Sequence, residues 1–294
     1  MLALAAVAAS AFDLQGHRGA RGLLPENTIA AFQRALQEGA DTLELDVMLT
    51  ADGVPVVSHD PALNPDLTRD AAGRWLDGPG PLIRSLTLAQ LQAYDVGRAR
   101  PGSRTARDFP LQQPADGQRI PTLAQVLALG GPRTRFNIEI KLDPRMPEQF
   151  APLEQVVDAV VRAVEQAGVG PRVLIQSFNW NVLQRSQRVA PQLVTSYLTM
   201  QRPNANTVDA PAWMAGFSLA AQGSVPRMVQ AAGGRWWAPN FRDVTAESVR
   251  EARSLGLKVA VWTVNEPADM QRMLDLGVDA LITDYPDRAA ALRR

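Results

Sequence analysis

The sequence predicts an α/β protein that folds as a (β/α)8 or TIM barrel, with an insertion after the second strand. Three observations carry this prediction. Strand-like and helix-like segments alternate, eight strand ends can be counted, and they are spread over about 250 residues, the usual length of such a barrel. A doubly wound open sheet is the alternative, but no glycine-rich phosphate-binding fingerprint follows a strand.

Length and composition are those of a globular protein with one barrel domain. The chain has 294 residues, of which 46% are hydrophobic and 20% charged, and we expect one domain over residues 12–294. The 30 basic and 30 acidic residues cancel, so no field of one sign favours nucleic acid or an anionic membrane surface. The expected partner is a small-molecule substrate, with monomer and homodimer both open. The chain has no cysteine, which excludes disulfides, thiolate catalysis and cysteine-ligated metals.

Residues 1–11, MLALAAVAASA, are small and apolar. They are similar to the apolar region and cleavage site of a secretory signal, although no lysine or arginine precedes them. We expect a signal-peptide remnant and a periplasmic or secreted protein; the alternative is an alanine-rich extension of a cytoplasmic one. No run reaches the roughly 20 apolar residues that span a bilayer.

The first strand, at residues 14–16, leads into the segment HRGARGLLPENT. A helix follows from about Asn27, with Asn27 or Thr28 as its cap and Gly39 as its end.

A β-hairpin over residues 41–60 comes next. Apolar and acidic residues alternate along 42–49, which places Glu44 and Asp46 on one face, and Asp52-Gly53 is a strong turn signal. A two-residue turn would put Asp46 opposite His59. A longer turn would shift the register by one residue and reverse the faces.

Residues 61–121 have patchy apolar periodicity, frequent Pro, Gly, Asp and Arg, and one helical piece at 86–94. So long an irregular stretch in a compact domain is usually a functional insertion. The rest is regular except for residues 201–223, which include an apolar piece of uncertain type at 213–219. Strands are expected at 135–142, 172–178, 193–198, 236–240, 257–264 and 279–283, and helices at 122–129, 152–167, 179–189, 225–232, 245–255 and 267–276.

Polar side chains collect at the carboxyl ends of the predicted strands, where barrel enzymes place their working residues. Both histidines of the chain fall there, with acidic and basic residues from separate strands. These residues are His17, Arg18, Glu44, Asp46, His59, Glu139 and Lys141, and the seventh strand adds Trp262.

Three carboxylates without cysteine favour a hard cation such as Mg²⁺ or Ca²⁺ over zinc. Arg18 and Lys141 are then free to face an anion. Together with two histidines, the set indicates phosphoryl chemistry with a general acid and a general base.

Seven segments carry a resemblance to a known family: HRGARGLLPENT, LELDVMLTADGVPVVSHDPAL, IPTLAQVLAL, FNIEIK, IQSF, VWTVN and GVDALITDYPD. In this order and spacing the chain resembles the glycerophosphodiester phosphodiesterase family over residues 16–287. The resemblance implies a TIM barrel with an insertion, and hydrolysis of glycerophosphodiesters to glycerol 3-phosphate and an alcohol with one divalent cation.

The same resemblance implies roles for individual residues. Matched to the family's motifs, the metal ligands are Glu44, Asp46 and Glu139, the acid–base pair is His17 and His59, the phosphate contacts are Arg18 and Lys141, and the aromatic residues beside the glycerol pocket are Trp262 and Phe178. In this family the substrate's own glycerol hydroxyl is thought to attack phosphorus, giving a cyclic phosphate that water opens. Either histidine could begin as the base, and core packing is an equal interpretation for Phe178.

Residues 61–121 and 201–223 depart from the family pattern, which leaves the leaving alcohol open. The first alternative is a lysophospholipase D or sphingomyelinase D type of lipid phosphodiesterase, which would lack the insertion and have an apolar rim. The second is a barrel that binds without catalysis, disfavoured because such a protein has no physical reason to keep several like charges together.

Overall fold

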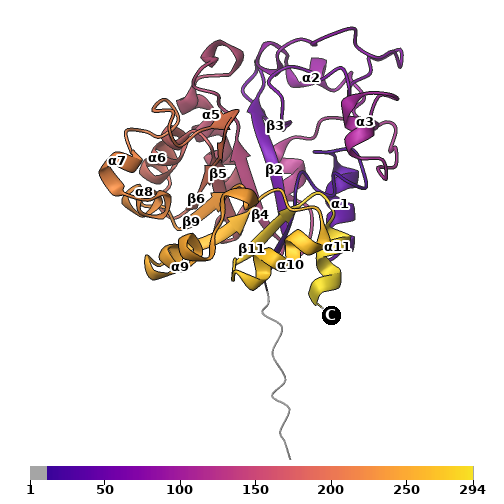
Figure 1. Cartoon of the computed structure of the whole chain (residues 1–294). Helices are drawn as coiled ribbons and strands as arrows, with labels where there is room; N and C mark the ends of the chain where they lie inside the picture. The colour runs from indigo at the N-terminus through magenta and orange to yellow at the C-terminus, as the bar shows by residue number, and fades with distance from the viewer. Residues whose placement is uncertain (1–11, 294) are drawn as a thin grey trace, which may run out of the picture.

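The computed structural model describes residues 12–293, so the expected signal remnant at 1–11 lies outside the described residues. A parallel sheet of eight strands closes into a barrel, because β1 pairs with both β11 and β2 (Figure 1). Around the barrel the strands are β1 (Asp13–Gly16), β11 (Ala280–Thr283), β10 (Lys258–Val261), β9 (Trp236–Pro239), β6 (Val194–Thr199), β5 (Val173–Ser177), β4 (Arg135–Ile140) and β2 (Thr42–Leu49). The predicted fold class is confirmed.

Helices alternate with these strands and cover the outside of the barrel (Figure 1). The longer ones are α1 (Ile29–Gln37), α5 (Leu153–Ala167), α6 (Trp180–Val189), α8 (Val225–Ala231), α9 (Ala246–Ser254) and α10 (Pro267–Asp275). Short helices are α2 (Leu88–Leu91), α3 (Arg104–Asp108), α4 (Leu123–Leu127), α7 (Leu219–Gln222) and α11 (Pro286–Ala290). Single 3₁₀ turns are η1 (Ile83–Ser85), η2 (Pro147–Gln149), η3 (Gly170–Arg172), η4 (Phe241–Asp243) and η5 (Ala291–Arg293).

Of the two candidate caps of α1, Thr28 is the one used, because its side chain accepts the backbone N–H of Ala31. Asn27 instead adopts a left-handed conformation with φ 56°, and its side chain donates a hydrogen bond to Asp46. None of the helices formed by residues 12–293 is both long and apolar enough to cross a membrane.

The outward faces of the strands pack against the helices in one large apolar core. On β2 the outward residues are leucines and a valine, and on α5 Val156, Val160 and Val164 recur at helical spacing toward them. The inward face of β2 therefore carries Glu44 and Asp46, as alternation along a strand requires.

The hairpin register differs by one residue from the two-residue-turn prediction. β3 (Pro55–Val57) pairs antiparallel with β2, and Val47 lies opposite Val57, which puts Asp46 opposite Ser58 and not His59. The turn is longer because Thr50 closes it: its backbone N–H donates to Val54 O at 3.1 Å, and its hydroxyl accepts the Val54 N–H at 2.9 Å. His59 thus lies beyond the last ladder pair.

Residues 61–121 lie beside β3 on one side of the barrel rim and include α2 and α3 (Figure 1). The expected helical piece at 86–94 is only α2. A second, smaller apolar cluster anchors the segment to the hairpin, with Leu63, Ile83 and Leu91 packed against Met48 and Val56. Residues 201–223 form a two-stranded ribbon, β7 (Gln201–Arg202) with β8 (Ala205–Asn206), then turns and α7.

Candidate active site

Three carboxylates meet inside the barrel near the carboxyl ends of β2 and β4. Glu44 and Asp46 lie on β2, and Asp46 is the register partner of Glu139 on β4. All three are buried, and they offer carboxylate oxygens within 4.8 Å of one another. The structure therefore brings together the three acidic residues that the sequence predicted as ligands.

Neighbouring donors fix the two carboxylates of β2. Glu44 accepts hydrogen bonds on both oxygens, from Gln176 Nε2 at 2.8 Å and from the backbone N–H of Arg18 at 3.0 Å. Asp46 Oδ2 accepts from Asn27 Nδ2 at 2.9 Å. The other oxygen, Asp46 Oδ1, is buried and has no hydrogen-bond partner among residues 12–293. A buried acceptor of this kind requires an explanation, and a bound cation would supply one.

The electrostatics of the cluster also fit a cation. Burial, followed by repulsion from Asp46 and Glu139, raises the pKa of Glu44 well above its ordinary value. Burial raises the pKa of Glu139 to about 7, although Lys141 Nζ at 2.8 Å opposes this. Burial also acts to raise the pKa of Asp46, but nearby charges, Arg18 foremost, outweigh it and hold that pKa below its usual range. A divalent ion would offset these like charges, and carboxylate oxygens are the donors that a hard ion prefers.

Arg18 is buried against acidic side chains in a strained turn. Its Nη1 lies 2.9 Å from Glu26 Oε1, and its Nε lies 3.2 Å from Asp46 Oδ2. Its φ is 51°, and its carbonyl accepts the N–H of Asn27, which is also left-handed. Two such non-glycine residues cost of order 1–3 kcal/mol each and are typical of functional sites. The second predicted phosphate contact, Lys141, lies 3.7 Å from Asp46 Oδ1.

His17 follows the end of β1, and its Nδ1 lies 2.6 Å from Asp284 Oδ1. Only 13% of the His17 side chain is exposed. Burial lowers the pKa of His17 below its ordinary value, and Asp284 acts in the opposite direction. The ring is therefore neutral near pH 7 and able to accept a proton.

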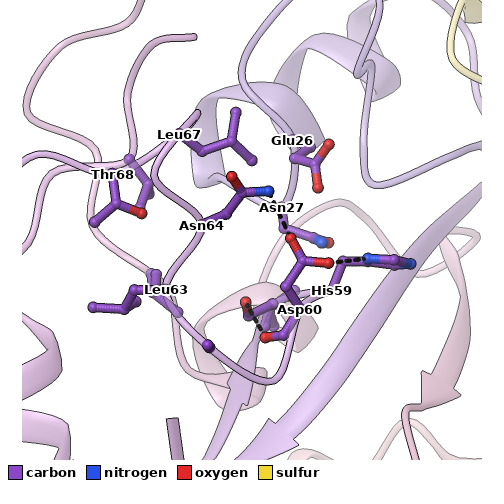
Figure 2. Close-up of a pocket in the computed structure, with 13 residues that line it drawn as sticks. Glu26, Asn27, His59, Asp60, Leu63, Asn64, Leu67 and Thr68 are labelled. Carbon is purple, nitrogen blue, oxygen red and sulfur yellow. Dashed lines mark hydrogen bonds and ion pairs between the residues drawn. The ribbon is translucent and has the colours of Figure 1, made fainter. Parts of the chain in front are cut away.

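His59 follows β3, and its Nδ1 lies 2.8 Å from Asp60 Oδ1 (Figure 2). Burial, with Arg18 and Lys141 next, lowers the pKa of His59 to about 4. Burial raises the pKa of Asp60, but hydrogen bonding and charge attraction from His59, with a hydrogen bond from Asn64, bring it down to about 2. His59 lines one cavity together with Asn27, whose Nδ2 donates to Asp46, so the ring lies near the carboxylate cluster despite the shifted register.

A cavity of about 40 Å³ lies between the end of β3 and residues 61–121. Figure 2 shows the Asp60 and Asn64 side chains meeting at its edge. It has room for roughly two or three water molecules. Polar side chains that line it include Glu26, Asn27, Asp60, Asn64 and Thr68.

Aromatic side chains border the same rim. The ring of Phe178 packs edge-on against Trp262, with centroids 5.3 Å apart, and against Trp213, with centroids 6.3 Å apart. Lys141 Nζ lies 5.9 Å from the Phe178 centroid, so the aromatic group is next to the carboxylates. Phe178 and Trp262 also contact the apolar residues of the barrel interior, which means that they pack as well as line the rim.

Five residues near the site were not predicted as site residues from the sequence: Asn27, which was expected only as a candidate helix cap, Gln176, Asp60, Asp284 and Trp213. All of them except Trp213 lie within the quoted motifs, and Asp284 directly follows a predicted strand end. That position could have identified Asp284, because strand ends are where barrel sites collect. Gln176 contacts Glu44 across the barrel interior from a strand that is not its neighbour, a contact that no local pattern contains.

The family model and two relatives that match this chain all belong to one family of phosphodiesterases. The model of the glycerophosphoryl diester phosphodiesterase family matches residues 17–288. A glycerophosphodiester phosphodiesterase of Caldanaerobacter subterraneus subsp. tengcongensis is 32% identical over 283 residues, which is 95% of this chain and 96% of the relative. A glycerophosphodiester phosphodiesterase of Bacillus subtilis is 31% identical over 274 residues, covering 92% of this chain and 83% of the relative.

Solved structures agree in fold. A crystal structure from Silicibacter pomeroyi is 39% identical with a TM-score of 0.87, over 97% of this chain and 93% of that one. A phosphodiesterase of Oleispira antarctica, solved in complex with its product sn-glycerol-3-phosphate, is 25% identical with a TM-score of 0.70, over 95% and 96% of the two chains.

Proposed function

Because this chain belongs to the glycerophosphoryl diester phosphodiesterase family, we propose that the mouth of its barrel hydrolyses glycerophosphodiesters with the help of one divalent cation. The protein is a glycerophosphodiester phosphodiesterase, a hydrolase that forms glycerol 3-phosphate and an alcohol. The observation that carries the proposal is the cluster of three buried carboxylates beside two histidines and two cationic side chains.

Glu44, Asp46 and Glu139 would hold the cation, Mg²⁺ or Ca²⁺. When bound, such an ion polarises a phosphoryl oxygen and stabilises the charge that develops there. The unsatisfied buried oxygen of Asp46 and the raised pKa values of the two glutamates support this assignment.

His17 and His59 would move the protons. One imidazole accepts the proton of the substrate's glycerol hydroxyl while that oxygen bonds to phosphorus, and the other donates a proton to the alcohol oxygen as its bond to phosphorus breaks. The products of this step are the free alcohol and a cyclic glycerol phosphate. In the second step the histidines exchange roles: water loses a proton to one, its oxygen opens the ring, and the ring oxygen gains a proton from the other.

Arg18 and Lys141 would contact the phosphate. Arginine offers a planar fork of donors and lysine a compact charge, so that together they can bind two phosphate oxygens. Phe178 and Trp262 would border the glycerol moiety with their rings.

The test is release of glycerol 3-phosphate from glycerophosphocholine and glycerophosphoethanolamine by the purified chain. We expect a chelator to abolish release, and Mg²⁺ or Ca²⁺, supplied separately, to restore it. An Asp46→Asn variant serves as the matched negative control, because it keeps the side-chain shape and removes one anionic ligand.

Two results would contradict the proposal. Release that persists in chelator with no cation added would exclude the metal-assisted mechanism. Cleavage of lysophospholipid, with neither glycerophosphodiester turned over, would assign the site to the lipid phosphodiesterase alternative.

A further inference from the structure

His17 is the first member of a three-residue hydrogen-bond chain built from neighbouring strands. Its Nδ1 lies 2.6 Å from Asp284 Oδ1, and Asp284 Oδ2 accepts from Asn265 Nδ2 at 2.7 Å. The three residues follow β1, β11 and β10, which are adjacent in the barrel. Asp284 is only 3% exposed, so water does not compete strongly for its oxygens.

The donor and the acceptor of each hydrogen bond among His17, Asp284 and Asn265 can be assigned. Asn265 Oδ1 accepts the backbone N–H of Asp284 at 3.0 Å, and a backbone N–H can only donate. The other end of that amide, Nδ2, must therefore point at the carboxylate. Attraction to His17 and Arg21 holds the pKa of Asp284 below its usual range against the effect of burial, and an ionised carboxylate only accepts. Nδ1 of His17 must then carry the proton, which leaves the lone pair on Nε2.

His59 is held in the same way by residues from a different part of the chain (Figure 2). Its Nδ1 lies 2.8 Å from Asp60 Oδ1, and Asp60 Oδ2 accepts from Asn64 Nδ2 at 2.7 Å. Asn64 Oδ1 accepts the backbone N–H of Asp66 at 2.9 Å, which fixes the amide as at Asn265. Two unrelated segments thus produce one pattern: an anchored asparagine, an aspartate and the Nδ1 of a histidine.

We propose that Asp284 with Asn265, and Asp60 with Asn64, are positioning residues that hold both histidines in the Nδ1-protonated tautomer, with Nε2 as the nitrogen that exchanges protons. The inference rests on the proposed function, because it deepens the assignment of the acid–base pair. In this proposal all four residues act through the two rings.

The sharpest variant is Asp284→Asn, which keeps the size and shape of the side chain. The anchored Asn265 still presents an N–H, so the new carbonyl oxygen must face it and the new NH₂ must face His17. Nδ1 then becomes an acceptor, and the proton moves to Nε2. We expect kcat to fall roughly 10²- to 10⁴-fold, the range that general acid–base catalysis contributes.

Exchanging the carboxylate of Asp284 with the amide of Asn265 should restore part of the kcat that Asp284→Asn loses. In the double variant Asp284→Asn/Asn265→Asp, the carboxylate at position 265 accepts both the backbone and the side-chain N–H of residue 284. The amide oxygen is again free to face His17, which restores the tautomer. We expect the double variant to recover roughly tenfold or more of kcat over the single variant, a gain within the range of one acid–base contribution. Asp60→Asn and Asp60→Asn/Asn64→Asp form the matched pair for His59.

The tautomer can be observed directly without turnover. The chain has 2 histidines, so ¹⁵N-histidine labelling followed by long-range ¹H–¹⁵N spectroscopy gives four ring nitrogens, assigned by His17→Gln and His59→Gln. At pH 8, where both rings are neutral, the native protein should show protonated Nδ1 and unprotonated Nε2 on both rings. Asp284→Asn should exchange the two signals of His17 alone.

The proposal is overturned if the signals of His17 are unchanged in a folded Asp284→Asn protein, or if the double variant is folded and no more active than the single one. Failure of the proposed function gives a different result: native protein without glycerophosphodiester turnover but with the expected tautomers. The spectra therefore decide the positioning role even where activity assays do not.

Discussion

The two halves of the barrel interior differ in the chemistry of their side chains. Strands β1, β2, β4 and β5 point amides and carboxylates inward, joined across the interior by hydrogen bonds from Gln176 to Glu44 and from Asn137 to both Gln15 and Gln176. Strands β6, β9, β10 and β11 point small and aliphatic side chains inward instead. These residues are Leu198, Ala238, Ala260, Ala280 and Ile282.

The difference indicates a division of work between the halves. Buried carboxylates with raised pKa values cost stability at neutral pH, whereas burial of apolar groups contributes it, at about 25 cal/mol per Å². The polar half of the barrel therefore carries the proposed cation site at a cost in the free energy of unfolding. Apolar burial in the other half offsets part of that cost.

Glu139→Gln should separate function from stability within the polar half. Loss of one anionic ligand should lower activity by roughly 10³-fold, because a bound cation contributes several kcal/mol and each 1.36 kcal/mol is tenfold. In chelator at pH 8 the variant should unfold at a higher temperature than the native chain, since the buried charge is gone. The measurements are kcat/KM and calorimetric melting. A lower melting temperature at equal activity would reverse the division we infer.

Leu198→Ala should do the opposite in the apolar half. Leu198 is 2% exposed within the interior cluster, and truncating such a side chain typically costs about 2–5 kcal/mol of unfolding free energy. Urea unfolding measures this cost, while kcat should fall by less than about tenfold, because Leu198 contacts no proposed metal ligand or histidine and reaches the site only through the cluster on which Phe178 and Trp262 pack. A large loss of kcat in the folded variant would show that the two halves are coupled.

Gln176→Met should weaken the cation site without removing a ligand. Gln176 Nε2 donates to Glu44 Oε1, and loss of such a supporting hydrogen bond typically lowers metal affinity about 10- to 100-fold. Titration calorimetry with Mg²⁺ or Ca²⁺ measures the affinity. The matched control is Ser196→Ala, because Ser196 is the register partner of Gln176 and its buried hydroxyl has no hydrogen-bond partner in the described part of the chain. Equal affinities in the two variants would exclude an orienting role for Gln176.

The sequence predicted the parts of the site that local periodicity determines. Alternation along β2 placed Glu44 and Asp46 on one face, and strand ends placed Glu139 beside them. Of the two hairpin registers that the sequence left open, the longer turn forms and the pairing of Asp46 with His59 does not, because the hydroxyl of Thr50 closes the turn, a choice that Asp52-Gly53 alone does not reveal. Prediction from the sequence stops where hydrogen bonds join strands that are distant along the chain.

Two further features depend on tertiary context. Arg18 adopts a left-handed conformation that arginine rarely takes, sustained by the hydrogen bond from Asn27 to its carbonyl. The pairing of Asp284 with His17 joins residues at opposite ends of the chain and exists only because the barrel closes between β11 and β1. The eight strands could be counted, but the sequence did not say which side chains would meet at the closure.

The smallest expected effect is a dependence of cation binding on pH. In the cation-free protein, burial raises the pKa of Glu139 to about 7, so this carboxyl is protonated at pH 6 and ionised at pH 8. The folded chain then binds a proton that the unfolded chain has lost, and stability in chelator falls as pH rises from about 4.5 toward 7. A cation must displace that proton, so its affinity should fall roughly tenfold between pH 8 and pH 6. In Glu139→Gln both pH dependences should become shallower, and melting and cation titration across this range measure them. Unchanged slopes in the variant would mean that the titrating group of the polar half is not Glu139.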